Sequence, residues 1–360
     1  MPLNLPMRRI ALLLIGMTGA CGDSGPSDPT IGPTRSYRMG FSSFPPRPDQ
    51  ALAVQSIELW STRADAAILH EAMPWTRLLA GADPDALAQE LHGSLVAYYR
   101  GKGHLVVFTL DPTDGLSRGD EAPELRDAGR SISESAVQQL YRRWGRAVLS
   151  VLKPDYLGLA AETNLIRFMA PRPVYDALVR MTNDLAAELA PIRGSTSVFV
   201  SVQVETAWGK LATSGGYQGV TVDLADFPFM NSLGLSSYPY FGWPDPNDVP
   251  LDYFSRLPAG RTLAVLFVEG GWTSAGVGTV TATPETQARW IRRFGAILDS
   301  AKAVAAVQLA FTDIDVASFG LPPGSIVPLF AHLGMVDINL SPKPALAVWD
   351  SLFASRRPQP

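Results

Sequence analysis

Three glutamates stand directly at the ends of apolar runs: Glu162 after YLGLAA, Glu205 after SVFVSVQV and Glu269 after LAVLFV. A carboxylate beside a hydrophobic core must be paired, solvated or shifted in pKa, because uncompensated burial of its charge costs free energy. Carboxyl groups held in this way serve as nucleophiles or as general acids and bases. The pattern therefore indicates carboxylate chemistry, with structural ion pairing as the alternative interpretation.

The elements that must position these glutamates follow from the alternation of short apolar runs with longer amphipathic stretches. The predicted strands are residues 37–44, 66–71, 105–110, 156–162, 197–204, 232–237, 263–269 and 305–311. Most are nearly continuous in apolar residues, which is typical of parallel strands buried on both faces. The predicted helices include residues 134–152, 174–189, 285–301 and 344–354. This alternation predicts a single α/β domain, a (β/α)8 TIM barrel over residues 35–360.

The alternative topology is an open doubly wound sheet, which would carry a glycine-rich phosphate turn after its first strand. The segment FSSFPPRP at residues 41–48 contains no glycine, so the barrel is favoured. In a TIM barrel, functional side chains come from the C-terminal ends of the strands, and the three glutamates should therefore meet at one rim. Residues 112–131, after the third predicted strand, are expected to form a long surface loop on the same side.

Composition limits the possible partners. The chain has 360 residues, of which 46% are hydrophobic and 18% charged, and this favours a globular protein. The net charge is −4 and no basic run is interleaved with aromatic residues, so nucleic acid is not an expected partner. The four histidines and the single cysteine are scattered. We therefore expect no metal site and no cofactor, and we expect a monomer.

The N-terminus has the layout of an export signal. Arg8 and Arg9 precede the apolar residues 10–17, a stretch too short to cross a bilayer of about 30 Å. Residues 1–20, followed by the only cysteine, Cys21, resemble a bacterial lipoprotein signal, and residues 21–34 read as a flexible tether. The expected product is a cell-envelope lipoprotein, periplasmic or on the outer surface, with a lipid anchor on Cys21. A plain secretory signal and an unprocessed, buried cysteine are the alternatives.

A resemblance to a known family rests on several short motifs in order. Glu162 and Glu269 end the fourth and seventh predicted strands, and the sixth strand reads LGLSSYPY at residues 233–240. EGGW follows at residues 269–272, GMVD at 334–337 and SPKPA at 341–345. In these features the chain resembles the (β/α)8 barrels of glycoside hydrolase clan A, and most of all the family 53 endo-β-1,4-galactanases.

The resemblance implies a retaining glycoside hydrolase that acts on a β-linked poly- or oligosaccharide by a two-glutamate double displacement. Glu269 would be the nucleophile, Glu162 the general acid and base, and Tyr238 would orient Glu269. Such enzymes hold their two carboxyl groups about 5–5.5 Å apart. The residues expected to contact the sugar are Tyr238, Trp272, Asn164, Glu205, Trp208, Trp243, His70 and Phe311.

The sequence departs from the clan pattern in two places. Ala161 stands where the clan has an asparagine that binds the sugar 2-hydroxyl, and Asn164 would replace it only if its loop bends back. The clan arginine near the second strand is missing, and His70 and Glu71 stand there instead. A catalytically silent carbohydrate-binding barrel is therefore the alternative function. A third possibility is a barrel enzyme of another class, with Glu205 and His70 as acid and base.

Overall fold

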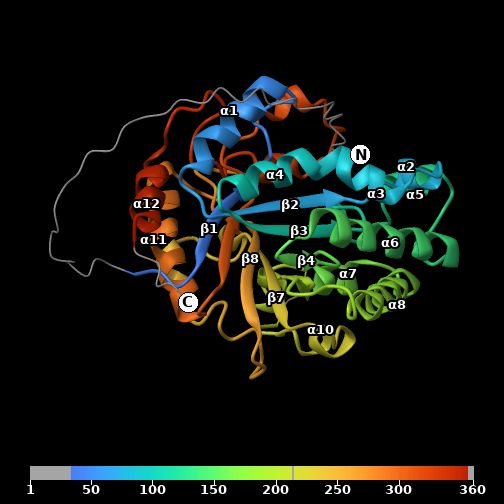
Figure 1. Ribbon diagram of the computed structural model, residues 1–360. Coiled ribbons are helices and arrows are strands. Elements are labelled where there is room, and N and C mark those ends of the chain that lie inside the picture. Colours follow the sequence, from blue (N-terminus) through green and yellow to red (C-terminus); the bar gives the residue numbers. More distant parts are fainter. Residues whose placement is uncertain (1–33, 213–214, 356–360) are drawn as a thin grey trace, which may run out of the picture.

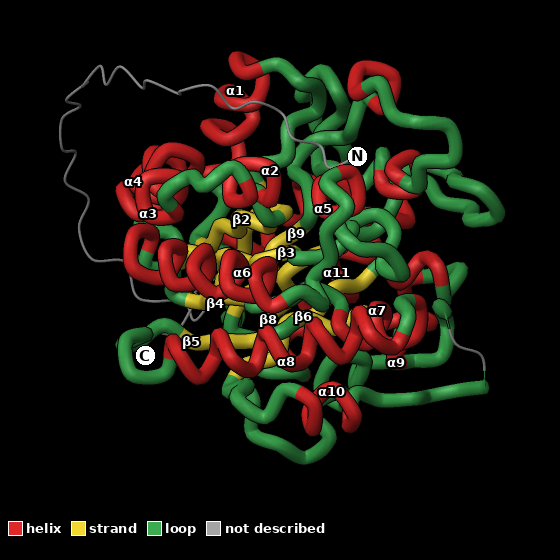
Figure 2. The backbone as a smooth tube through the Cα atoms, turned by 90° about the vertical axis from the view of Figure 1, so that its right-hand side faces the viewer, coloured by secondary structure: helices red, strands yellow, loops and turns green. Residues whose placement is uncertain are grey.

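The computed structural model describes residues 34–212 and 215–355. The predicted signal peptide, the lipidation site Cys21 and the tether up to residue 33 lie outside this described part. Within it, parallel strands form a central sheet that helices surround (Figure 1, Figure 2). No helix of the described residues is long and apolar enough to cross a membrane.

The sheet closes into an eight-stranded barrel. Its strands are β1 (Arg38–Ser42), β2 (Ala66–Ala72), β3 (Leu105–Asp111), β4 (Tyr156–Gly158), β5 (Ser197–Phe199), β6 (Ser201–Gln203), β7 (Ser232–Ser237), β8 (Ala264–Gly270) and β9 (Ala305–Gln308). Their order is β5-β4-β3-β2-β1-β9-β8-β7-β6, with every pairing parallel. Because β5 and β6 are two halves of one predicted strand, interrupted at Val200, the ends of this order meet. The predicted TIM barrel is confirmed.

Helices follow the strands and cover the outside of the barrel. The longer ones are α1 (Gln50–Ser61), α4 (Ser94–Gly101), α6 (Ser135–Ala147), α8 (Arg172–Leu189), α11 (Pro284–Ser300) and α12 (Pro344–Phe353). The shorter ones are α2 (Trp75–Leu79), α3 (Pro84–Ala88), α5 (Pro123–Asp127), α7 (Thr163–Met169), α9 (Val204–Ala207) and α10 (Thr221–Asp226). The predicted helix over residues 134–152 is α6 continued by a π-helical turn, Val148–Leu152, which ends where Lys153 adopts a left-handed conformation.

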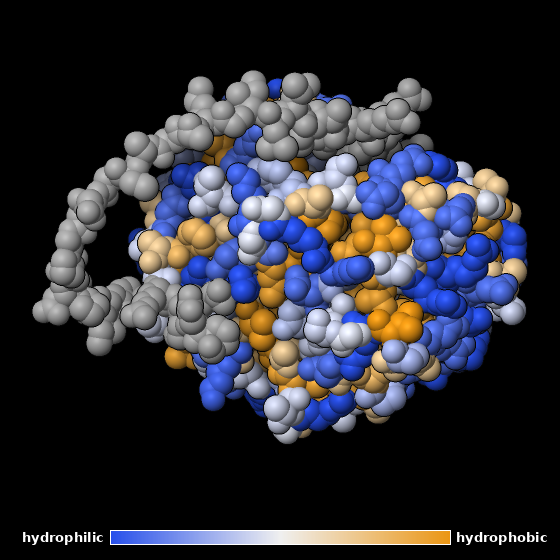
Figure 3. Space-filling model, viewed as in Figure 1, coloured by the Kyte–Doolittle hydropathy of each residue, from blue (hydrophilic) through white to orange (hydrophobic). Residues whose placement is uncertain are grey.

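The helices bury one face and expose the other. In α11 the buried set includes Trp290, Ile291 and Phe294, which pack on the sheet, and Thr283 forms a capping box with Thr286 at its N-terminus. The outer surfaces of α6 and α8 are charged, and Arg142 pairs there with Asp184 and Glu188. Hydrophilic residues correspondingly gather over this side of the molecule in Figure 3.

The interior of the barrel is packed with side chains rather than open. Its core consists of Ala66, Ile68, Val107, Phe199, Leu266, Val268, Ala305 and Val307. Phe199 fills the centre because its neighbours at this level are glycines. A Cβ atom on Gly158 would lie 2.8 Å from the Phe199 ring, and one on Gly234 would lie 2.7 Å from it. The site therefore lies above a filled core, at the C-terminal ends of the strands.

Candidate active site

Glu269 owes its direction to an irregularity in β8. Leu235 pairs with Phe267, but the next residue of β7, Ser236, pairs with Glu269, so Val268 is an extra residue in the β8 edge. Partners in adjacent strands point to the same face of a sheet, and such bulges re-aim side chains. Glu269 and Ser236 consequently share the face that leads into the barrel mouth.

Glu162 reaches the same mouth from the other side. β4 ends at Gly158, four residues before the end of the predicted strand, and the chain then turns into α7 through Glu162. Glu162 has a φ of +48°, in the left-handed region that costs free energy for a residue with a Cβ atom. The Glu162 backbone N–H donates a 2.9 Å hydrogen bond to the Ser201 hydroxyl of β6, which holds this conformation.

Two donors hold the Glu162 carboxylate. Arg118 Nε donates to Oε2 at 2.8 Å, and the Ser236 hydroxyl donates to Oε1 at 2.7 Å. The predicted surface loop at residues 112–131 lies on the side of the glutamates, as expected, but it is not irregular throughout, because it includes α5. It carries an antiparallel bridge between Thr113 and Glu121, and its Arg118 is only 7% exposed because it is drawn inward by acidic partners.

Two other residues hold Glu269. The Tyr238 hydroxyl donates to Oε1 at 2.6 Å, and His70 Nδ1 lies 3.1 Å from Oε2. His70 comes from β2 and Tyr238 directly follows β7, so three strands of the barrel meet at this carboxylate. The structure therefore brings together four of the residues selected from sequence: Glu162, Glu269, Tyr238 and His70.

The two glutamates differ in their electrostatic surroundings. Burial raises the pKa of Glu162, and this effect together with repulsion from Glu269 outweighs the opposing effect of Arg118. Burial also acts to raise the pKa of Glu269, but there the positive charges of His70 and Arg118 prevail and lower it. Burial acts to lower the pKa of His70, yet Glu269 and Asp111 raise it to about 10. One carboxyl group is thus biased toward its protonated form and the other toward its ionised form.

Two polar residues expected at the sugar lie elsewhere. Asn164 is fully buried, where its amide donates to the Gln203 carbonyl at 2.9 Å and accepts from the Gln203 N–H at 2.7 Å. Asn164 lies in the first turn of α7 rather than on a loop, and its amide is engaged by Gln203. Glu205 is fully buried as well, and it accepts hydrogen bonds from Ser237, Tyr253 and Gln203. Both side chains join barrel segments to each other and expose no surface to a ligand.

The aromatic residues expected as sugar platforms also pack against protein. Trp272 stacks on Trp290 with ring centroids 5.4 Å apart, and Phe311 meets Phe41 edge-on at 5.1 Å; both Trp272 and Phe311 are 1% exposed.

Trp208 and Trp243 are half-buried neighbours, with ring centroids 6.0 Å apart. Arg256 lies over the ring of Trp208, and Lys210 lies over the ring of Trp243. These cations occupy one face of each indole.

Several residues of the site were not predicted from the sequence. Asp111 ends the apolar run LVVFTL, the same signal that marked the glutamates, and could have been found from it. Arg118 lies in a polar loop with no such signal. Phe330 is half-buried, with its ring 4.7 Å from that of Tyr238, and Phe241 packs beside both. Phe330 and Phe241 are thus half-buried aromatic rings beside Tyr238, which holds Glu269, while Tyr240 on the same side is buried.

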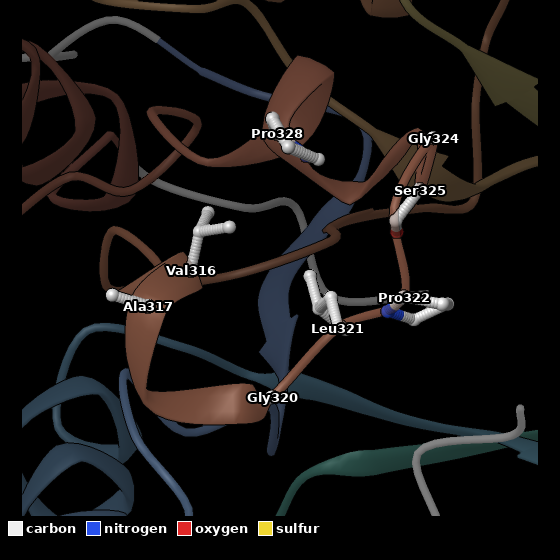
Figure 4. A pocket seen from close by; sticks show the side chains of 8 residues that line it. All are labelled: Val316, Ala317, Gly320, Leu321, Pro322, Gly324, Ser325 and Pro328. Carbon is white, nitrogen blue, oxygen red and sulfur yellow. The ribbon is translucent and has the colours of Figure 1, made fainter.

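The remaining candidate sites carry little chemistry. In residues 34–212 and 215–355, no three His, Cys, Asp or Glu side chains are placed to hold a metal ion. A hollow of about 340 Å³ lies in the loop after β9, where Val316, Leu321 and Pro328 contribute apolar walls (Figure 4). Its lining contains no titratable side chain, so it is separate from the carboxylate pair.

No protein-family model and no curated protein matches the sequence. Solved structures do match. The exo-β-1,4-mannosidase Op5Man5 from Opitutaceae bacterium strain TAV5 is 15% identical, with a TM-score of 0.64 over 91% of this chain and 62% of its own. Xylanase 10B from Thermotoga maritima is 14% identical, with a TM-score of 0.60 over 88% and 95%.

A β-glucuronidase from Ruminococcus gnavus is 12% identical, with a TM-score of 0.55 over 90% of this chain. This chain spans about half the length of that protein, 50%. At these identities the likeness concerns the fold alone, which is the (β/α)8 barrel.

Proposed function

We propose that the protein is a retaining glycoside hydrolase that cleaves a β-linked poly- or oligosaccharide. One observation carries the proposal: Glu162 and Glu269 both lie at the mouth of the barrel and interact electrostatically, and their pKa values are shifted in opposite directions. Retaining hydrolysis needs this division, because one carboxyl must be protonated to release the leaving group while the other is ionised to attack. The shared fold of the mannosidase and the xylanase supports the same reaction class.

The reaction would proceed in two displacements. A carboxylate oxygen of Glu269 attacks the anomeric carbon while Glu162 gives its proton to the glycosidic oxygen, so the bond to the leaving sugar breaks as the glycosyl–enzyme ester forms. Glu162, now ionised, then removes a proton from water as that water attacks the anomeric carbon. The ester breaks, Glu269 is released as a carboxylate, and Glu162 is protonated again. The Tyr238 hydroxyl keeps Glu269 oriented through both steps.

The test is hydrolysis of a panel of aryl β-glycosides and β-linked polysaccharides by the wild type and two isosteric variants. Glu269→Gln should lose about 10⁴-fold or more in kcat because the nucleophile is gone. Glu162→Gln should lose about 10²–10⁴-fold, the usual contribution of a general acid. Glu90→Gln, which changes a carboxylate in an exposed ion pair with Arg77, serves as the control and should keep full activity.

Azide assigns the two roles separately. In Glu162→Ala, azide attacks the glycosyl–enzyme from the face that water uses and should give a β-glycosyl azide. In Glu269→Ala, azide takes the place of the nucleophile and should give the α-anomer. Products of the opposite configurations would reverse the assignment, and a wild type that is inert across the whole panel would refute glycosidase activity.

Galactan is the substrate we propose within this class, on the strength of the sequence motifs shared with endo-β-1,4-galactanases. Phe330 and Phe241 are our candidates for the apolar surface that receives a sugar ring, because they flank Tyr238 and are half-buried. The panel therefore includes β-1,4-galactan beside mannan and xylan. Preferential cleavage of mannan or xylan would exclude the galactan assignment and leave the hydrolase assignment intact.

A second candidate function is glycan binding without cleavage. Both oxygens of Glu162 accept hydrogen bonds, from Arg118 and Ser236, and Ala161 leaves the usual 2-hydroxyl donor missing. The two hydrogen bonds act to lower the pKa of Glu162 against the effect of burial, and the missing donor would weaken transition-state contacts. Saturable binding of one polysaccharide by a wild type that releases no sugar would establish this candidate.

We further propose that the protein acts as a monomer in the cell envelope, held to a membrane by lipid on Cys21. The support is the order of basic, apolar and small residues before the only cysteine. Cys21→Ser should abolish incorporation of labelled fatty acid and move the protein from the membrane fraction to the soluble fraction. Unchanged fractionation of this variant would remove the anchor from the proposal.

A further inference from the structure

Asp111 has contacts that the proposed reaction does not use. It ends β3 at the barrel mouth and is 4% exposed. Arg118 Nη1 donates to both of its carboxylate oxygens, at 2.9 and 2.7 Å, and His70 Nε2 lies 3.6 Å from Oδ2. Neither of the glutamates touches Asp111. Both of its charged neighbours do touch a glutamate, Arg118 at Glu162 and His70 at Glu269.

The five groups therefore form one continuous chain of alternating charge: Glu162, Arg118, Asp111, His70 and Glu269. Asp111 occupies the middle, and its backbone belongs to the sheet. β3 pairs with β2, and the Met73 N–H donates a 3.0 Å hydrogen bond to the Asp111 carbonyl. The Asp111 carboxylate is also closely packed, since a Cβ atom on Gly115 would lie 3.3 Å from it. Arg118, by contrast, comes from the loop beyond β3 and depends on side-chain partners for its position.

We propose that Asp111 is a positioning residue that anchors Arg118 and His70 and thereby gives each of the two glutamates its own cation. The proposal rests on the proposed function, in which Glu162 and Glu269 have different tasks. Asp111 touches neither substrate nor reacting atoms, so its effect passes through the two cations. Without its charge, His70 keeps Glu269 as its one acidic partner, and Arg118 turns more fully toward Glu162.

The first measurement follows His70 itself and needs no activity. Nuclear magnetic resonance of the full chain, labelled with carbon-13 histidine, resolves four rings, and a His70→Gln spectrum identifies the one of interest. In the wild type His70 should stay charged from neutral to mildly alkaline pH, since its pKa is about 10. In Asp111→Asn its midpoint should fall by about one pH unit or more, the usual effect of losing a neighbouring opposite charge.

The second measurement is the pH profile of kcat/KM. His70, even with its midpoint lowered by about one unit, stays charged where Glu269 titrates, so the acidic limb should stay in place. With Arg118 closer to Glu162, the pKa of that carboxyl falls and the basic limb moves to lower pH. Asp111→Asn should therefore narrow the bell-shaped profile from its basic side, whereas a residue needed only for folding would lower the whole curve without moving either limb. Asp111→Glu, which restores the charge, should restore the width.

The control variant is Asp313→Asn. Asp313 is a buried carboxylate that pairs with Lys343 at 2.6 Å and lies 3.6 Å from another histidine, His332. Asp313→Asn makes the same chemical change as Asp111→Asn, and it should leave both the His70 midpoint and the pH profile of kcat/KM unchanged.

If Asp111→Asn does not fold, Arg118→Gln tests the same series of charged residues at its Glu162 end. Because Glu162 then loses its cation, the basic limb of the kcat/KM profile should move to higher pH. An unchanged His70 midpoint in Asp111→Asn, or unmoved limbs in Arg118→Gln, would overturn the proposal. Absence of hydrolysis by the wild type would refute the proposed function while the His70 measurement still decides the role of Asp111.

Discussion

At the scale of the residue, two identical side chains acquire different chemistry from their neighbours. Both glutamates are buried, and burial alone would raise the pKa of each. The difference arises because Glu269 lies against the imidazole of His70 and accepts from Tyr238, while Glu162 has a single cation, which it shares with Asp111. The sequence could identify the glutamates from their position after apolar runs. It could not identify Arg118, because that contact joins a polar loop to a residue 44 positions away.

Tyr238→Phe should isolate the contribution of one hydrogen bond to Glu269. The ring and its packing on Phe330 remain, while the 2.6 Å donor is lost. A hydrogen bond to a charged group contributes about 1.5–3 kcal/mol, so kcat/KM should fall about 10- to 100-fold, with the acidic limb moved to higher pH.

Tyr240→Phe is the matched control, because its hydroxyl donates at 3.0 Å to the Leu329 carbonyl and does not touch a carboxylate. Equal losses in the two tyrosine variants would show that aromatic packing, and not the bond to Glu269, matters.

At the scale of the element, strand ends deviate from regularity where the site requires it. The predicted strand over residues 105–110 agrees with β3 to within one residue because a strand buried on both faces reads as a nearly continuous apolar run. The predicted strand over residues 156–162 is shorter in the structure, because Glu162 leaves the sheet in a left-handed conformation that Ser201 stabilises. The bulge at Val268 could not be predicted either, because an extra residue does not alter the apolar pattern of a buried strand.

Barrel closure around Phe199 yields a stability prediction. Gly234→Ala would place a Cβ 2.7 Å from the Phe199 ring and 3.0 Å from the Ser201 Cβ, so the core would be overpacked. The free energy of unfolding should fall by about 1–3 kcal/mol, measured by urea denaturation.

Gly101→Ala, at the end of α4 with no atom within 4 Å of the new Cβ, should instead leave stability unchanged or raise it by up to about 1 kcal/mol. Adding Phe199→Leu to Gly234→Ala should return part of the lost stability. No recovery in this double variant would contradict the account of the glycine as space for the ring.

At the scale of the whole molecule, the alternation of apolar runs and amphipathic stretches was sufficient to predict the barrel, because closure of a parallel sheet by helices is a property of the pattern. The same pattern was not sufficient to predict how the side chains are arranged within the rim. Asn164, Glu205, Trp272 and Phe311 have types suited to sugar binding, but their burial depends on packing between segments that are distant in sequence. The likeness to glycoside hydrolases of 12–15% identity agrees with this division, since the fold is shared while the sequences differ.

The pH dependence of global stability should depend on a histidine far from the glutamates. His92 packs edge-on against Phe108 and is 6% exposed, and burial lowers its pKa from 6.5 to about 4. Between these two pH values the unfolded chain binds a proton that the folded chain does not, so stability is present above pH 6.5 and is lost as the pH falls toward 4. The loss from His92 alone is about 3 kcal/mol. Glu71, whose pKa burial raises from 4.5 to about 7, acts in the opposite direction with a shift of equal size, so the contribution of His92 is read from the difference between variants and not from the wild type alone.

Urea denaturation at several pH values from 7 down to 4.5 isolates the contribution of His92. His92→Leu removes the titrating ring while keeping an apolar side chain against Phe108, so the variant should lose less stability than the wild type as the pH falls. His332→Gln, which changes a histidine whose side chain is 43% exposed, should retain the wild-type slope. If the His92→Leu and wild-type curves stay parallel over this range, the acid sensitivity of the fold must come from other groups, and His104, whose pKa burial also lowers, becomes the next residue to replace.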